Sequence, residues 1–255
     1  MNVKELYRYL DLKIPSSLSC DWDNDGLMCC PDPEREIKKV LITLDITERA
    51  VKYAVDGKFD LIISHHPLIF KKIGAFDAEK TPSRKLLELI KNDISAFSFH
   101  TRLDALEGGV NDVLAKKLNL KEIRPFGPEG EKMGRIGVLD KEVTLKELCS
   151  QIKNALSSPM VLFADSGRKV KKVALLGGDG KDFVTSAISE GADTYLSGRI
   201  SYNIMAEASE MGINLIEAGH FFTEDPVCKM MEVLIKEAVC GVETEIFCSN
   251  EIKVI

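Results

Sequence analysis

The chain has 255 residues, of which 45% are hydrophobic and 29% charged. This length accommodates one large domain or two modest ones, and the composition is that of an ordinary globular protein. The net charge of −6 excludes a protein whose whole surface binds a polyanion. No apolar run reaches the roughly 18 residues that a membrane-spanning helix requires, so we expect a cytoplasmic protein with no membrane partner.

The seven cysteines are scattered and contain no C-x-x-C pair. This usage predicts reduced thiols in a reducing compartment. A cysteine nucleophile would need a paired base, and every histidine has another predicted role. We therefore expect no cysteine-based catalysis.

Hydrophobic periodicity predicts alternating strands and helices, which is typical of the α/β class. In the first half, the predicted strands are 40–46, 61–66 and 96–100, and the predicted helices are 48–57, 86–92 and 110–118. In the second half, the strands are 135–139, 160–164, 173–178, 194–198 and 213–220, and the helices are 144–156, 182–191 and 202–211. A helix over 226–239 and a strand over 243–247 complete the pattern.

The two halves resemble each other. A shift of 133 positions places residues 37–66 over 170–199 with seven identities, which predicts an internal duplication. Segment 119–134 is rich in proline, glycine and charge and is the predicted boundary. We expect two similar α/β domains, 1–125 and 126–220, with 221–255 packing back onto the first.

All four histidines follow predicted strands: His65, His66, His100 and His220. The carboxyl ends of strands in α/β sheets are where ligands bind. A carboxylate stands four residues after two of these histidines, in HTRLD (100–104) and HFFTE (220–224). Each motif alone is more often an ordinary capping or solvated pair, but together they predict a divalent metal site at these strand ends.

The adjacent histidines at 65 and 66 impose a condition on this site. Successive side chains of a strand point to opposite faces, so the two rings can converge only if the strand has already ended. Pro67 supports such an ending because it cannot continue the hydrogen-bonded ladder.

Two further motifs are interpreted as structural. GGDG (177–180) lacks the spacing of a nucleotide-binding loop and predicts a tight turn. DWDNDGL (21–27) places aspartates at alternate positions like a calcium loop, but the terminal glutamate of that loop is missing. We expect an Asx-rich turn that buries Trp22 and Leu27.

Four motifs in order resemble those of the NGG-interacting-factor family, whose bacterial members are usually named GTP cyclohydrolase I type 2 homologues. They are WDNDGL (22–27), ISHHPLIF (63–70), HTRLD (100–104) and GHFFTE (219–224). The resemblance spans nearly the whole chain and implies two similar α/β domains, a dinuclear metal centre between them and a ring-like homohexamer.

Residue by residue, the resemblance implies a set of metal ligands, with Glu224 bridging both ions and His100 beside the site. If His100 holds no metal, its imidazole is the predicted catalytic residue. The implied ligands are His65, His66, Asp104, His220 and Glu224. The cofactors would be two divalent ions per chain, of zinc, iron or manganese.

This chain also departs from the family. Arg102 stands where the family has asparagine, and Arg199 and Asn203 replace an acid and a histidine of a later motif. The central insert of longer members is absent. The surroundings of any bound anion therefore differ from those in the relatives.

Two functions follow from these motifs. The first is a metal-dependent hydrolase acting on an amide, amidine or phosphoester, with GTP ring opening as one instance and His100 as a proton shuttle. The second is a metal-binding regulatory or scaffold ring that binds protein or single-stranded nucleic acid. A basic lining would favour a small anionic substrate, although solvated surface charge explains the same residues, which are Lys71, Lys72, Arg102 and Arg199.

Overall fold

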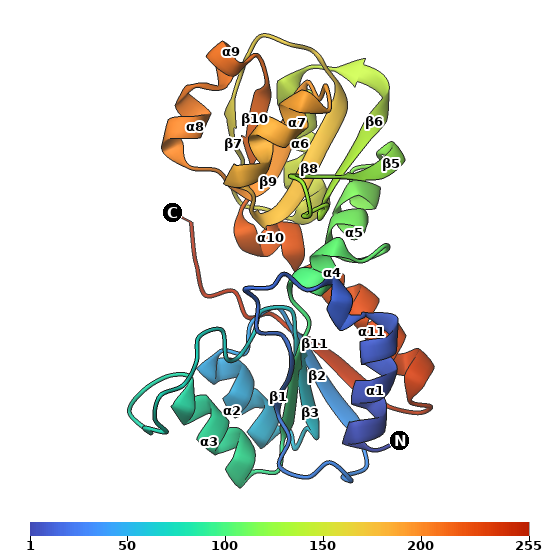
Figure 1. Ribbon diagram of the computed structural model, residues 1–255, viewed down its shortest axis with the longest axis vertical. Coiled ribbons are helices and arrows are strands. Elements are labelled where there is room, and N and C mark those ends of the chain that lie inside the picture. Colours follow the sequence, from blue (N-terminus) through green and yellow to red (C-terminus); the bar gives the residue numbers. More distant parts are fainter. Residues whose placement is uncertain (255) are drawn as a thin grey trace. The chain divides into compact units, whose positions relative to one another are not determined.

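A computed structural model describes residues 1–254 and contains two mixed β-sheets with helices on their faces (Figure 1). By their contacts, the residues form two compact units. The first unit contains Met1–Leu103 and Cys228–Glu251, and the second contains Asp104–Val227. Within residues 1–254, no helix has the length and apolar character needed to cross a membrane.

The first unit has the strand order β1-β4-β3-β2-β11, in which only β1 is antiparallel to its neighbour. Its strands are β1 (Gly26–Cys29), β2 (Lys39–Thr43), β3 (Leu61–Ser64), β4 (Ser95–Ser98) and β11 (Glu243–Phe247). Helices α2 (Glu48–Asp56) and α3 (Ser83–Lys91) cover one face, and α1 (Val3–Lys13) and α11 (Val227–Ala238) cover the other (Figure 1). A 3₁₀ turn, η1 (Ser16–Leu18), follows α1.

Helix α1 was not predicted, although its sequence explains it. Asn2 caps the helix by accepting a hydrogen bond from the Glu5 backbone N–H at 2.8 Å, and the Glu5 carboxylate accepts from the Asn2 N–H at 3.0 Å. This reciprocal pair is a capping box. Val3, Leu6 and Leu10 form its buried stripe. The helix therefore covers the apolar face of the first sheet.

The second unit has the strand order β5-β6-β8-β9-β10-β7, with β8, β9 and β10 parallel. Its strands are β5 (Lys121–Phe126), β6 (Gly134–Val143), β7 (Leu162–Ala164), β8 (Val170–Asp179), β9 (Thr194–Arg199) and β10 (Asn214–Glu217). Its helices are α5 (Val110–Lys117), α6 (Leu145–Leu156), η2 (Lys181–Phe183), α7 (Val184–Ser189), α8 (Tyr202–Ala206), α9 (Ala208–Met211) and α10 (His220–Glu224). Helix α4 (Thr101–Ala105) carries the chain from the first unit into the second.

Two apolar clusters lie on opposite faces of the second sheet. Leu148 and Ile152 of α6 pack with Leu175 of β8, whereas Val184 and Ala187 belong to the cluster on the other face. Helix α5 packs against β6 and β8. These contacts place α5 in the second unit. The second unit therefore begins before residue 125, after which the predicted division falls.

The predicted boundary segment 119–134 is not a linker. It forms β5 and a turn, and β5 pairs antiparallel with β6. Pro125 is compatible with this strand because β5 lies at the edge of the sheet, where a missing N–H breaks no ladder on the open side. Proline and glycine here mark an edge hairpin.

The two sheets repeat the same register at the predicted shift of 133 residues. Val40 pairs with Leu61 in the first sheet, and Val173 pairs with Thr194 in the second. The Asp60 carboxylate accepts the backbone N–H groups of residues 38 and 39, and Asp193 accepts those of 171 and 172. The internal duplication stays a prediction, and this correspondence supports it.

Glycines at the ends of β8 and β9 let α10 approach the second sheet closely. A Cβ on Gly178 would lie 2.1 Å from Glu224 Oε1, and one on Gly198 would lie 2.6 Å from Thr223 Oγ1. Gly178 also has a φ of +69°, which residues other than glycine rarely adopt. The Gly178 N–H donates to Thr223 Oγ1 at 3.1 Å. The predicted tight turn is therefore wrong for most of GGDG, because residues 177–179 are the irregular end of β8 and only Gly180 lies beyond the strand.

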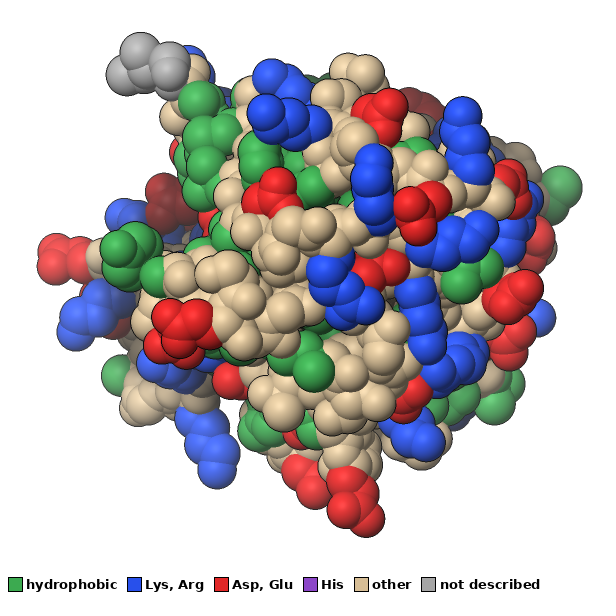
Figure 2. Space-filling view, turned by 90° about the horizontal axis from the view of Figure 1, so that it is seen from above, with side chains coloured by type: hydrophobic (Ala, Val, Ile, Leu, Met, Phe, Trp, Pro, Cys, Tyr) green, Lys and Arg blue, Asp and Glu red, His purple; other side chains and the backbone are tan. Residues whose placement is uncertain are grey.

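On the face drawn in Figure 2, lysines and arginines are interspersed with aspartates and glutamates. Mixed charge of this kind is typical of a solvated surface. It agrees with the modest net charge of the chain.

We expect Gly198→Ala to lower the free energy of unfolding by about 1–3 kcal/mol, because the added methyl group overlaps Thr223 and the Gly178 carbonyl. Urea unfolding would measure the change. Gly74→Ala is the matched control, since a Cβ there meets nothing within 4 Å, and it should stay within about 0.5 kcal/mol of the parent. Equal effects of the two substitutions would contradict the close approach of α10.

We expect Glu232→Gln to remove part of the pH dependence of folding. The Glu232 carboxylate accepts hydrogen bonds from Lys229, Lys236 and Thr244, which lower its pKa from 4.5 to about 2. This contribution is complete above the unfolded pKa and is lost as the pH falls through the folded one. The parent should therefore lose more stability than the variant between pH 4.5 and about 2.

Urea midpoints measured across that pH range test this prediction. The matched control is Glu237→Gln, which changes an exposed glutamate of the same helix. If the Glu232→Gln and parent curves stay parallel, the ion-pair cluster contributes nothing to acid stability.

Candidate metal centre

His65 and His66 follow the end of β3, which stops at Ser64. The His66 N–H donates to the Leu44 carbonyl at 3.0 Å, and the Ser64 hydroxyl donates to the His66 carbonyl at 2.7 Å. These bonds turn the chain out of the strand. The two imidazole rings consequently lie on the same side, with their centroids 5.0 Å apart. The expected condition for convergence is confirmed.

His100 joins them from the end of the neighbouring strand. β3 and β4 are parallel, and Ser64 pairs with Ser98, so the residues that follow each strand emerge at the same sheet edge. The His100 ring lies 5.3 Å from that of His65 and 5.6 Å from that of His66. One ligand atom from each ring lies within 4.8 Å of the others. We call these three residues the histidine cluster.

Each ring of the histidine cluster is oriented through its Nδ1 atom. His65 Nδ1 lies 2.9 Å from the Phe99 carbonyl, and His66 Nδ1 lies 2.7 Å from Asp45 Oδ1. His100 Nδ1 lies 2.9 Å from Asp23 Oδ1. A carbonyl or carboxylate oxygen can only accept, so Nδ1 carries the proton and Nε2 carries the lone pair. This is the arrangement of metal-binding histidines, whose other nitrogen donates to an oxygen.

Asp23 and Asp25 fix the start of α4 around His100. Asp23 accepts from the Thr101 N–H at 3.0 Å and from its hydroxyl at 2.6 Å, while Asp25 accepts from the His100 N–H at 3.1 Å. Burial alone would raise the pKa of Asp23, but hydrogen bonds from His100 and Thr101 hold it below its ordinary value. The aspartates of the DWDNDGL segment therefore support the histidine cluster.

The expectation that this segment buries its apolar residues is wrong. Trp22 is 58% exposed and Leu27 is 47% exposed. The segment does form a turn, which is closed by the Asp23 N–H donating to the Cys20 carbonyl at 2.9 Å, and the Asn24 N–H donates to Asp23 Oδ1 at 2.8 Å. The carboxylates turn inward to the start of α4, and the indole lies on the outside.

Arg102 does not belong to a basic lining. Its side chain is buried, and it pairs with Asp25 at 2.9 Å and with Asp11 at 2.7 Å. Burial alone would lower the pKa of Arg102, but these two carboxylates outweigh it and the net shift is upward. The Lys71, Lys72 and Arg199 side chains are exposed. Arg102 thus joins α1 to the loop that holds His100.

His220 and Glu224 belong to the second unit and lie one turn apart on α10. His220 Nε2 and Glu224 Oε2 are 3.0 Å apart. The Glu224 side chain is 5% exposed and that of His220 is 43% exposed. Asp104 is also in this unit and is buried, with its backbone carbonyl accepting from Asn111 Nδ2 at 3.2 Å.

Imidazole nitrogens and carboxylate oxygens suit divalent first-row metals such as zinc, iron and manganese. The histidine cluster and the His220–Glu224 pair are consistent with metal binding. Sequence reasoning missed the orienting residues Asp23 and Asp45. Asp23 lies inside the DWDNDGL motif and Asp45 follows β2, but their histidine partners are 77 and 21 residues away in sequence.

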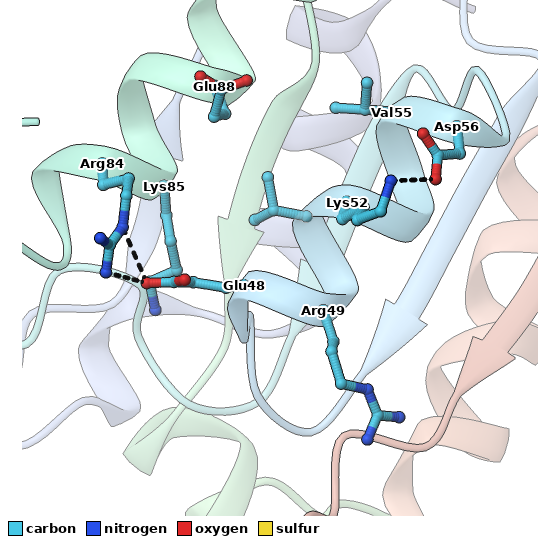
Figure 3. Close-up of a pocket in the computed structure, with 9 residues that line it drawn as sticks. Glu48, Arg49, Lys52, Val55, Asp56, Arg84, Lys85 and Glu88 are labelled. Atoms are coloured by element: carbon cyan, nitrogen blue, oxygen red, sulfur yellow. Dashed lines mark hydrogen bonds and ion pairs between the residues drawn. The ribbon is translucent and has the colours of Figure 1, made fainter.

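A separate groove of about 490 Å³ lies between α2 and α3 (Figure 3). Its charged side chains already have partners, since Arg84 pairs with Glu48 and Lys52 pairs with Asp56. The Lys85 ammonium donates to the Ile46 carbonyl at 2.6 Å. None of the predicted site residues lines this groove.

The fold matches solved structures along its whole length. The crystal structure of Staphylococcus aureus hypothetical protein SA1388 superposes with a TM-score of 0.89 and 27% sequence identity, covering 100% of this chain and 99% of that one. Reduced HcgD from Methanocaldococcus jannaschii superposes with a TM-score of 0.83 and 29% identity, covering 96% and 97% of the two chains.

The sequence comparison agrees with these structures. A protein of Clostridium perfringens named GTP cyclohydrolase 1 type 2 homolog is 34% identical over 258 residues, which cover 99% of this chain and 98% of the relative. The model of the Duf34/NIF3 (NGG1p interacting factor 3) family matches residues 1–253. This chain therefore belongs to the Duf34/NIF3 family, as its four motifs predicted.

Proposed function

We propose that this protein is a metal-dependent hydrolase with a dinuclear divalent-metal centre. In this proposal the ligands are His65, His66, Asp104, His220 and Glu224, with Glu224 bridging the two ions. His100 is the catalytic residue that carries a proton. The ligand set follows the family motifs, and the orientation of the histidine cluster is the observation that carries the proposal.

That orientation matters because each Nδ1–H already donates a hydrogen bond to an oxygen of the protein. The acceptors at Phe99, Asp45 and Asp23 hold the rings in the tautomer that presents an Nε2 lone pair. The rings of His65 and His66 are thereby preorganised for a cation, with little rotational freedom left to lose on binding, and His100 presents its Nε2 lone pair to a proton. A cluster of surface histidines would lack these fixed acceptors.

When bound, two divalent ions would lower the pKa of a water molecule and polarise a substrate oxygen. Asp23 supports the proton transfer that we assign to His100, because its carboxylate stabilises the ring when Nε2 takes up a proton. The His100 side chain is 17% exposed, so it remains accessible to substrate and solvent. Amides, amidines and phosphoesters are the substrate classes that this chemistry serves.

GTP is the substrate class suggested by the name of the Clostridium perfringens relative, which is called a GTP cyclohydrolase 1 type 2 homolog. Ring opening of a purine is hydrolysis of a cyclic amidine and falls within the proposed chemistry. The hexameric ring and the regulatory alternative with protein or single-stranded nucleic acid stay predictions. Loss of turnover without loss of assembly in ligand variants would favour the hydrolase.

We expect the His65→Ala/His66→Ala variant to lose the metal that the parent retains, which should be about two ions per chain. Mass spectrometry on protein purified without chelator or nickel resin would measure the content. His100→Gln is the matched control, because it should retain the metal while losing turnover of GTP. A parent that stays metal-free after incubation with zinc, manganese and iron would overturn the proposed site.

We expect Asp45→Asn to weaken metal binding by roughly 10- to 100-fold, since the amide no longer holds the His66 ring through a charged acceptor. Competition with a chromogenic chelator measures the affinity without any assay of activity. Asp56→Asn, at an exposed position paired with Lys52 on α2, is the matched control and should leave the affinity unchanged. Equal affinities of all three proteins would show that Asp45 does not orient the ligand.

A further inference from the structure

Two large aromatic side chains beside the histidine cluster are exposed to solvent. Trp22 is 58% exposed and Phe70 is 49% exposed, although side chains of this size usually bury most of their surface. Their ring centroids are 6.2 Å apart with an interplanar angle of 71°. We call this pair the aromatic platform.

The aromatic platform is built around His100. The Trp22 ring lies 6.1 Å from that of His100 and the Phe70 ring lies 6.2 Å from it, at interplanar angles of 76° and 83°. Edge-to-face contacts of this kind join an edge of one ring to a face of another. They therefore leave broad indole and phenyl surface in solvent, directly beside a residue of the histidine cluster.

Hydrogen bonds hold the two loops of the platform together. The Asn24 side-chain amide donates to the Ile69 carbonyl, which joins the loop of Trp22 to that of Phe70. The Cys20 N–H donates to Thr101 Oγ1 at 3.0 Å, and the Asp23 N–H donates to the Cys20 carbonyl at 2.9 Å. The exposed rings are thus fixed in place before any ligand arrives.

The chemistry beside the platform indicates what it would bind. Exposed aromatic surface attracts flat, polarisable rings, and stacking tolerates any base because every base has a π-face. The neighbouring imidazoles and carboxylates, in contrast, suit polar ring atoms. A planar nitrogen heterocycle combines both properties, whereas an aliphatic chain or a free phosphate has only one of them.

We propose that Trp22 and Phe70 stack on the planar nitrogen heterocycle of the substrate and direct its polar edge toward His100. This inference rests on the proposed hydrolase function and adds the residues that select the substrate by shape. Asn24 acts as a positioning residue because it ties the two aromatic loops together.

Trp22 is the only tryptophan of the chain, so its fluorescence reports on the platform directly. Metal-loaded protein would be titrated with GTP, ATP and UTP, and with inorganic triphosphate as the probe that lacks a ring. We expect the nucleotides to quench the indole and triphosphate to leave it unchanged. Equal responses to nucleotides and triphosphate would overturn the platform.

Variants test whether the aromatic ring itself, and not another part of the loop, binds the nucleotide. We expect Phe70→Leu to weaken nucleotide binding by roughly 10-fold or more, and Phe70→Tyr to retain it because a ring is kept. Phe76→Leu is the matched control, since Phe76 is 64% exposed and lies six residues along the same connection. Trp22→Leu, followed by calorimetry, should show a similar loss. Unchanged affinity in both Phe70→Leu and Trp22→Leu would overturn the proposal.

Metal content measured in the same samples distinguishes the two proposals. Normal metal content without stacking contradicts only the platform, whereas a metal-free parent contradicts the hydrolase. The Trp22 emission maximum could instead shift on dilution and show no response to nucleotides. That result would assign the platform to contact with a second copy of the chain and would also overturn the proposal.

Discussion

The parallel pairing of β3 with β4 is the constraint on which the histidine cluster depends. Its register sets Ser64 beside Ser98, and the two hydroxyls lie 2.8 Å apart. Both strands end at this point, so side chains 34 residues apart in sequence meet at one edge of the sheet. The orienting acceptors matter only because the register has already brought the rings together. A slip of one residue would move the end of β4, and His100 with it, out of line with the end of β3.

The second unit has a similar strand framework but places its candidate metal-binding side chains on a different kind of element. At the shift of 133 residues, Gly198 and Arg199 stand where the first unit has His65 and His66. Because glycine has no side chain, α10 can lie against the ends of β8 and β9. The second unit therefore presents His220 and Glu224 from a helix, whereas the first unit presents its histidines from loops after strands.

Periodicity predicted the parallel core strands and most helices because these elements bury regular apolar patterns. It missed α1, where charged residues stand between those of the apolar buried stripe, and the hairpin of β5, whose proline and glycine residues suggested a boundary between the halves. The histidines could be predicted from their places after strands. Asp23 could not, since its partner His100 is distant in sequence. Hydrophobicity alone also placed Trp22 inside, although the fold keeps it in solvent beside His100.

The buried ion pair of Arg102 has a consequence for how this sequence can change over evolution. Its guanidinium is shared between Asp25 inside the loop and Asp11 on α1, and it also donates to the Ile14 carbonyl at 3.0 Å. Losing Arg102 alone would leave the buried Asp25 carboxylate uncompensated, at a cost of roughly 3–5 kcal/mol. The Asp11 side chain is 39% exposed and tolerates the loss better. Replacement of Arg102 is therefore least costly when its carboxylates change with it, which links the sequence of the N-terminal helix to that of the loop around His100.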